Sequence, residues 1–173
     1  GRVVFPQVES RLGEGSAPGS RPPLVLISGE IGSGKSRLVE EFRHFLKLNY
    51  VQVYFGNCYD GQNCAYQPFV EALKQLAVYL GREDPLFQKY SDALLKLLPE
   101  FRTKEDIERP LGLRPDQEKL YFIDQIVRFF IETAKRQPYA LILNNLHWAD
   151  EMTVELLGYL IQNVVEEAVS YTH

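Results

Sequence analysis

The sequence predicts a three-layer α/β domain, in which a mostly parallel sheet of about four or five strands carries helices on both faces. Two observations predict this class. Short apolar runs alternate with longer stretches in which apolar residues recur at helical spacing, and such a β-α-β-α order is typical of a parallel sheet. The composition, 45% hydrophobic and 24% charged over 173 residues, is that of one globular domain rather than a disordered chain.

A segment rich in Gly, Ser and Pro precedes the predicted domain. Residues 12–23 read LGEGSAPGSRPP, which we interpret as a flexible connector. We therefore divide the chain into an N-terminal segment with its connector, residues 1–23, and a folded domain, residues 24–173.

The first predicted strand and helix lie on either side of a glycine-rich turn. Leu24–Ile27 is a short apolar, β-branched run that ends at Ser28 and Gly29, and it predicts a buried strand. A helix is expected over Ser36–Leu46, where apolar residues recur at helical spacing. The apolar residues at this spacing are Leu38, Val39, Phe42, Phe45 and Leu46.

The next stretch repeats the order of strand and helix. Val51–Phe55 predicts a second strand, and Pro68–Leu80 predicts a helix. Two more amphipathic helices are expected at about Pro85–Leu98 and Pro115–Lys135, and we interpret residues 84–136 as a helical insertion on the core. The helix over Pro68–Leu80 has one apolar face, made of Phe69, Leu73, Leu76 and Leu80.

The last third of the chain predicts a strand, a corner and a helix. Tyr139–Leu143 is a fully apolar strand, and Asp150 is expected to cap the helix that follows. We expect Trp148 to pack at the corner between them, and a last strand to begin near Ala168. The predicted inward residues of the helix are Val154, Leu157, Leu160, Ile161 and Val164.

The segment Gly29–Ser36, GEIGSGKS, matches the GxxxxGK[ST] pattern and lies between a predicted strand and a predicted helix. Its glycines let backbone N–H groups point at phosphate oxygens, and the helix N-terminus adds partial positive charge. We expect Lys35 to reach the β and γ phosphates and Ser36 to offer its hydroxyl to Mg²⁺. The predicted nucleotide-binding residues are Gly29, Glu30, Ile31, Gly32, Ser33, Gly34, Lys35, Ser36 and Arg37.

The second half of such a site needs a carboxylate at the end of another buried strand, and here two amides stand in that place. Asn144 and Asn145 follow the apolar strand and occupy the catalytic positions in degenerate form. An amide oxygen can contact the hydration shell of a metal, so Asn144 joins Ser36 in the predicted metal site. Because an amide carries no charge and accepts no proton, we expect hydrolysis to suffer more than binding.

Three stretches resemble the ATPase module of large bacterial signal-transduction proteins, the P-loop ATPases of the AAA and STAND type found in LuxR-like transcriptional activators. They read GEIGSGKSRLVEEF, NCAYQPFVEALKQL and ALILNNLHWADEMTVELLGYL. The family typically has an acidic pair before LHWAD, so Leu146–Asp150 match while Asn144 and Asn145 depart. The resemblance implies the P-loop NTPase fold, with ATP and Mg²⁺ as ligands. Family members continue into a sensor strand, an arginine-bearing segment and a lid, so the expected fold is truncated before these.

Other nucleotide-dependent functions stay open. Thr103–Asp106 fits the [NT]KxD pattern of GTPases, although it precedes the strand that ends at Asn144. A small P-loop kinase suits the chain length and the arginines between the two later helices. An active ATPase and a non-hydrolysing nucleotide sensor are the remaining alternatives. The resemblance favours an ATP-dependent switch that contacts other domains of a larger regulatory protein, with nucleotide-dependent self-association also considered.

Charge and cysteine content bear on partners and compartment. The formal net charge is −4, which argues against direct nucleic-acid contact through a broad basic surface. No apolar run approaches the ~20 residues that span a bilayer, so no membrane partner is expected. Cys58 and Cys64 are interpreted as two free thiols, and the chain as cytoplasmic.

Overall fold

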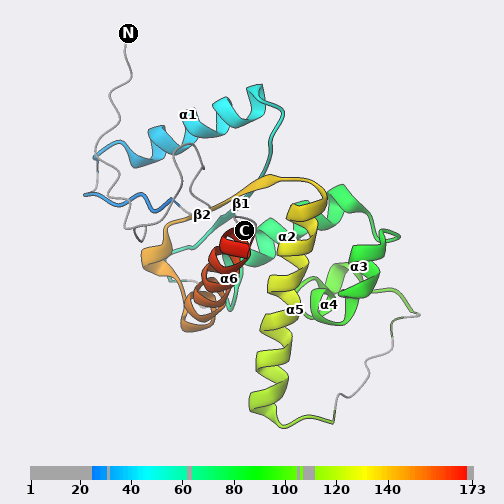
Figure 1. The fold of residues 1–173 in the computed structure, drawn as a ribbon. Helices are drawn as coiled ribbons and strands as arrows, with labels where there is room; N and C mark the ends of the chain where they lie inside the picture. Colours follow the sequence, from blue (N-terminus) through cyan, green and yellow to red (C-terminus); the bar gives the residue numbers. More distant parts are fainter. Residues whose placement is uncertain (1–24, 31, 62–63, 105, 107–111, 171–173) are drawn as a thin grey trace.

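The computed structural model describes residues 25–30, 32–61, 64–104, 106 and 112–170 (Figure 1). The predicted N-terminal segment and connector, Leu24 and Ile31 therefore lie outside the described residues. In chain order the elements are α1 (Lys35–Leu48), β1 (Gln52–Asn57), α2 (Gln67–Leu80), α3 (Pro85–Lys89), α4 (Ser91–Leu97), the 3₁₀ turn η1 (Pro99–Phe101), α5 (Pro115–Arg136), β2 (Tyr139–Asn144), the 3₁₀ turn η2 (Leu146–Trp148) and α6 (Glu151–Ser170).

The two strands pair in parallel, as the order of elements predicts. Gln52 lies opposite Tyr139, and the register runs on to Asn57 opposite Asn144. The amide of Cys58 extends the ladder by donating to the carbonyl oxygen of Asn144 at 3.0 Å. Parallel strands end at the same edge of a sheet, so the polar residues that follow β1 and β2 are brought together there.

The α/β class is confirmed, but the sheet has two strands in the described part of the chain, not four or five. Residues 25–27 form no strand, and Val25 and Leu26 are 52% and 68% exposed, so the prediction of a buried strand there is wrong for the described residues. A strand forms only beside a neighbour that shares its hydrogen bonds, and β2 pairs only with β1 among the described residues.

Helix α2 lies directly on β1 because Gly56 leaves room for it. A Cβ built on Gly56 would lie 1.9 Å from the carbonyl oxygen of Pro68, in the first turn of α2. From the same helix, Gln75 donates to the carbonyl oxygen of Phe55 at 2.6 Å and accepts from its amide at 3.3 Å. These bonds satisfy the outer edge of β1 in place of a further strand.

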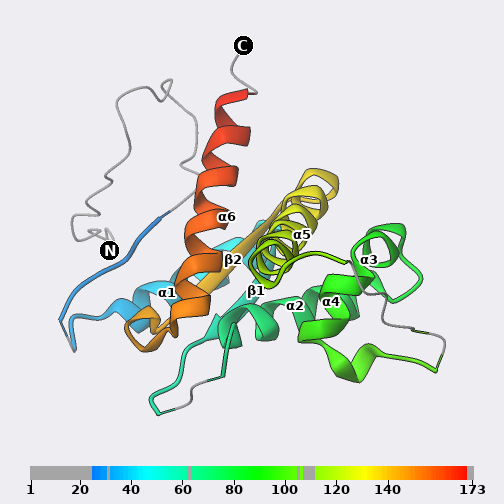
Figure 2. The same cartoon turned by 90° about the horizontal axis from the view of Figure 1, so that it is seen from below.

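The core lies between α2, α4, α5 and α6, which share one buried cluster (Figure 2). Much of the stretch predicted as an insertion therefore belongs to this core, through α3, α4 and α5. Its largest fully buried side chains are Phe69, Phe87, Phe129, Leu73, Leu76, Leu94, Leu98, Ile123, Ile126 and Leu156.

Helix α6 turns most of the predicted face inward, since Leu160 is buried and Leu157 and Val164 pack against the core, but Val154 departs from the prediction. Val154 is 56% exposed, whereas Thr153 and Leu156 are fully buried. The helix packs on α5 and α2, and that contact selects the face. It also continues to Ser170, so the strand predicted near Ala168 is a helix; apolar residues at helical spacing continue through Ile161 and Val164.

Helix α1 is less covered than its pattern predicts. It packs on β1, where Leu46 is buried and the Arg43 guanidinium lies 5.0 Å from the centre of the Phe55 ring. Phe42 and Phe45, two of the apolar residues at helical spacing, are exposed because the apolar face of α1 extends past the narrow sheet.

The helix predicted over Pro85–Leu98 is divided in two. Tyr90 leaves helical geometry, with φ −107° and ψ 11°, between α3 and α4. Its buried ring packs edge-on against Phe129, 5.9 Å between centres, and this contact with α5 accounts for the break. Of the helices in the described part, none is long and apolar enough to cross a membrane.

Replacing Gly56 by Ala should lower the free energy of unfolding by about 2 kcal/mol or more, because the added methyl group meets the backbone of Pro68. Gly158→Ala in α6 is the matched control, since a Cβ there has nothing within 4 Å and Ala favours the helix. Urea unfolding of the two variants measures the difference. Equal effects would contradict the close approach of α2 to β1.

Candidate nucleotide-binding site

The glycine-rich segment forms a turn that leads into α1. The amide of Ser33 donates to the carbonyl oxygen of Glu30 at 3.2 Å, which closes the turn. Gly32 and Gly34 have φ of 83° and 85°, a region that favours glycine, and Gly34 is the residue from which α1 begins. The motif therefore has glycine at Gly32 and Gly34, where the backbone takes a positive φ.

The ammonium group of Lys35 lies within this turn. It donates to the carbonyl oxygens of Gly29 and Glu30 at 2.6 and 2.5 Å, and it lies 3.3 Å from Oγ of Ser33. An ammonium group has three donors, so the turn occupies all three. A phosphate that binds Lys35 would have to replace some of these contacts.

The N-terminus of α1 fits an anion. The helix starts without a side-chain cap and without an acidic residue in its first turn. Unpaired N–H groups and the helix dipole favour negative charge at such an end. Ser36 and Arg37 lie in this first turn and are exposed, so both are accessible to a ligand at the loop.

The two asparagines follow one another at the end of β2. Asn144 is its last residue and is half-buried, and its amide nitrogen lies 3.5 Å from Oδ1 of Asn57. Asn145 takes a left-handed conformation, φ 57°, and starts η2. Figures 1 and 2 place this end of β2 on the same side of the molecule as the beginning of α1.

A carboxylate that the motif analysis missed lies at the same edge of the sheet. Oε2 of Glu71, on α2, accepts from the backbone amide and the side-chain amide of Asn57 at 3.0 and 3.3 Å. Its Oε1 accepts from Gln67 at 3.1 Å. The i to i+4 spacing of Gln67 and Glu71 is visible in the sequence, but their proximity to β1 is not.

At the corner after β2, the predicted cap by Asp150 is confirmed, whereas the predicted packing of Trp148 is not. Asp150 caps α6: Oδ1 accepts from the amide of Thr153 at 3.0 Å and Oδ2 from its hydroxyl at 2.5 Å. Trp148 is 43% exposed, with its ring 4.3 Å from that of His147, so the prediction that it packs into the corner is wrong. The reason is that η2 directs both rings outward.

The cysteines carry no disulfide: Cys58 is buried and Cys64 is exposed. Burial raises the pKa of the Cys58 thiol, and the carboxylates of Asp150 and Glu71 raise it further. The neutral thiol is therefore the form favoured at the edge of the sheet. Hydrogen bonding to Glu71 is the main cause that raises the pKa of Tyr59.

The GTPase-like segment forms a local turn away from the loop. Asp106 accepts from the amide of Thr103 at 2.6 Å and from Nη2 of Arg82 at 2.6 Å, and these bonds lower its pKa. Its carboxylate is thus already paired. The segment follows α4, which both views place far from the beginning of α1.

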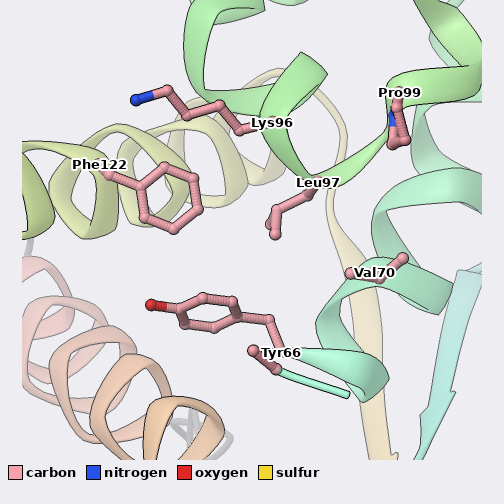
Figure 3. Close-up of a pocket in the computed structure, with 7 residues that line it drawn as sticks. Tyr66, Val70, Lys96, Leu97, Pro99 and Phe122 are labelled. Carbon is pink, nitrogen blue, oxygen red and sulfur yellow. The ribbon is translucent and has the colours of Figure 1, made fainter.

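A cavity of about 540 Å³ lies elsewhere, between α2, α4 and α5 (Figure 3). Leu97 of α4, Phe122 of α5 and Tyr66, the residue before α2, converge on it, and the ring centres of Tyr66 and Phe122 are 5.5 Å apart. Lys96, on its wall, pairs with Glu118 at 3.2 Å. None of the residues predicted to bind phosphate lines this cavity.

The residues of the loop fit a nucleotide phosphate chain, since an ammonium group, glycines with positive φ and an uncapped helix meet there. For Mg²⁺ the predicted protein donors are the Ser36 hydroxyl and the Asn144 amide oxygen. Both are oxygen atoms, which suit Mg²⁺, but neither is charged. Such a donor pair suits a metal bound mainly through the phosphates of the nucleotide.

The fold and this loop together define a phosphate-binding ATPase domain of the α/β class. The sequence matches the family described as AAA ATPase domain over residues 7–169, so the chain belongs to that family. Membership of this family implies that the chain binds a nucleotide. No curated protein and no solved structure matches it.

Lys35→Ala should weaken nucleotide binding at least about tenfold, a cost of ~1.4 kcal/mol, because it removes the one ammonium group held inside the turn. Lys47→Ala, in the last turn of the same helix, should leave the affinity unchanged. Calorimetry with ATP compares the two variants with the parent protein. Unchanged affinity of the Lys35 variant would contradict the assignment of the loop.

Proposed function

We propose that this chain is an ATP-binding module that acts as a nucleotide-dependent switch in a larger cytoplasmic protein of signalling or transcription regulation. In this proposal it resembles the STAND-type ATPases of LuxR-like regulators, binds ATP with Mg²⁺, and hydrolyses ATP weakly or not at all. Its partners are other domains of that protein or, in one nucleotide state, a second copy.

The observation that carries the proposal is that the sequence has every residue of the GxxxxGK[ST] motif, whereas β2 ends in Asn144 and is followed by Asn145, two amides. Asn144 and Asn145 offer neither a charge to a metal nor a base to water. The nearest acid in sequence, Asp150, already accepts two hydrogen bonds from Thr153. These contacts support binding with little turnover.

The contacts of Lys35 support the switch. Its ammonium group binds the carbonyl oxygens of Gly29 and Glu30. A γ phosphate that attracts the same ammonium group changes the conformation of the turn, and the turn leads directly into α1. The exposed rings of Phe42 and Phe45 on α1 would transmit that change to a partner domain.

ATP should bind more tightly than GTP, because the carboxylate of Asp106, which a guanine-reading motif would use, is paired with Arg82 and Thr103. Competition of the two nucleotides for a fluorescent analogue measures the preference. Equal or tighter binding of GTP would favour the GTPase alternative.

The chain should bind ATP and hydrolyse it at a rate barely above background. Changing both Asn144 and Asn145 to Asp should raise the rate, within the roughly 10² to 10⁴-fold that a positioned base contributes. Asp suits the left-handed conformation of residue 145 as Asn does. Release of inorganic phosphate is the measurement, and the same change made together with Lys35→Ala should abolish the gain.

Turnover of about 1 s⁻¹ or more by the parent chain would contradict weak hydrolysis and favour an active ATPase. Phosphate transfer from ATP to a small acceptor, with no release to water, would favour the kinase alternative. Measuring ATP affinity beside turnover therefore separates a non-hydrolysing switch from an active ATPase, and the transfer assay separates both from a kinase.

A further inference from the structure

A carboxylate at the edge of the sheet is held entirely by neutral donors. Glu71 accepts from the backbone and side-chain amides of Asn57 and from the side-chain amide of Gln67. An ionised carboxylate can only accept hydrogen bonds. Each of these neighbours must therefore present a donor to it.

This requirement fixes the orientation of the Asn57 amide. Its Nδ2 must face Oε2 of Glu71, at 3.3 Å, because its oxygen would be repelled there. The backbone amide of Asn57, 3.0 Å from the same oxygen, holds the carboxylate in place. Oδ1 of Asn57 is consequently turned the other way, toward β2.

The orientation of the Asn57 amide on β1 determines the orientation of the amide of its register partner on β2. Asn57 and Asn144 are paired residues of the parallel ladder, and Oδ1 of Asn57 lies 3.5 Å from Nδ2 of Asn144. An amide oxygen at this position can only accept, so Asn144 must present its nitrogen. Oδ1 of Asn144 is then the atom left to accept from a donor outside the relay.

We propose that Glu71 is a positioning residue: through Asn57 it orients the amide of Asn144 so that the oxygen of Asn144 faces the metal-bound water of the nucleotide site. This inference rests on the proposed binding of ATP with Mg²⁺. It makes Glu71, Asn57 and Asn144 one unit, the amide relay. Glu71, which lies on α2, thereby determines that Asn144 at the end of β2 presents its side-chain oxygen to the site.

The packing that places Glu71 belongs to the same relay. Gly56 allows the first turn of α2 to lie against the backbone of β1, and Glu71 follows one turn after Gln67. Gln75, one turn further on, bonds to Phe55 in a similar way and donates to the backbone carbonyl oxygen of Glu71 at 3.0 Å. Among the described residues it has no hydrogen bond to the Glu71 carboxylate, Asn57 or Asn144. It therefore serves as a matched control for contacts between α2 and β1.

The first test measures ATP affinity with Mg²⁺ and with EDTA in the parent chain, Glu71→Ala, Asn57→Ala and their double variant. The gain in affinity that Mg²⁺ produces should fall about tenfold in each single variant, as when an outer partner of a metal ligand is removed. The double variant should lose no more than either single one, since both break one relay. Gln75→Ala should keep the full gain, although it also loses bonds to β1.

An additive loss in the double variant, or an equal loss in Gln75→Ala, would show that Glu71 only anchors α2, and would overturn the proposal. A full Mg²⁺-dependent gain in Glu71→Ala would overturn it as well. If Glu71→Ala fails to fold, Asn57→Ala, which leaves the carboxylate in place, tests the same relay.

A second measurement does not depend on nucleotide. In ¹⁵N spectra of the protein without ATP, the side-chain amide signals of Asn144 should shift in Glu71→Ala, although Glu71 bonds to Asn57 rather than to Asn144. They should stay in place in Gln75→Ala. Unchanged Asn144 signals in Glu71→Ala would contradict the relay, whereas failure of the parent chain to bind ATP would contradict the proposed function.

Discussion

The parallel pairing of β1 with β2 is the constraint on which the rest of the structure depends. Because the strands run in the same direction and Asn57 lies opposite Asn144, both end at one edge of the sheet. Every element that follows a strand starts from that edge: the loop to α2 after β1, and η2 after β2. The register thus brings Asn57 and Asn144 together at this edge.

Helix α2 converts this edge into a defined arrangement of hydrogen bonds. Gly56 lets the helix approach the strand more closely than any other residue would, and Glu71 and Gln75 then replace the hydrogen-bond partners that a further strand would supply. Behind α2, the buried rings of Phe69, Phe129 and Phe130 pack against one another. The helix is thus packed against β1 on one side and against these rings on the other.

Helix α1 is less buried by the rest of the structure than helix α2. It is held on β1 by Leu46 and by the contact of Arg43 with Phe55, while Phe42 and Phe45 remain exposed. Few buried contacts allow an element to move at small cost in free energy. A loosely covered helix that begins at the phosphate loop suits a domain whose proposed role is to change its contacts with nucleotide state.

The sequence by itself determined the local elements, since helical spacing, the GEIGSGKS motif and the Asp150 cap are properties of neighbouring residues. It predicted the parallel order and the position of Asn144 at a strand end for the same reason. It did not predict that residues 25–27 lack a strand partner, that α6 turns Leu156 rather than Val154 inward, or that Phe42 stays exposed. Nor did it predict that Glu71 meets Asn57. Each of these depends on contacts between residues distant in the chain, which only the packing of α2, α5 and α6 around the two strands decided.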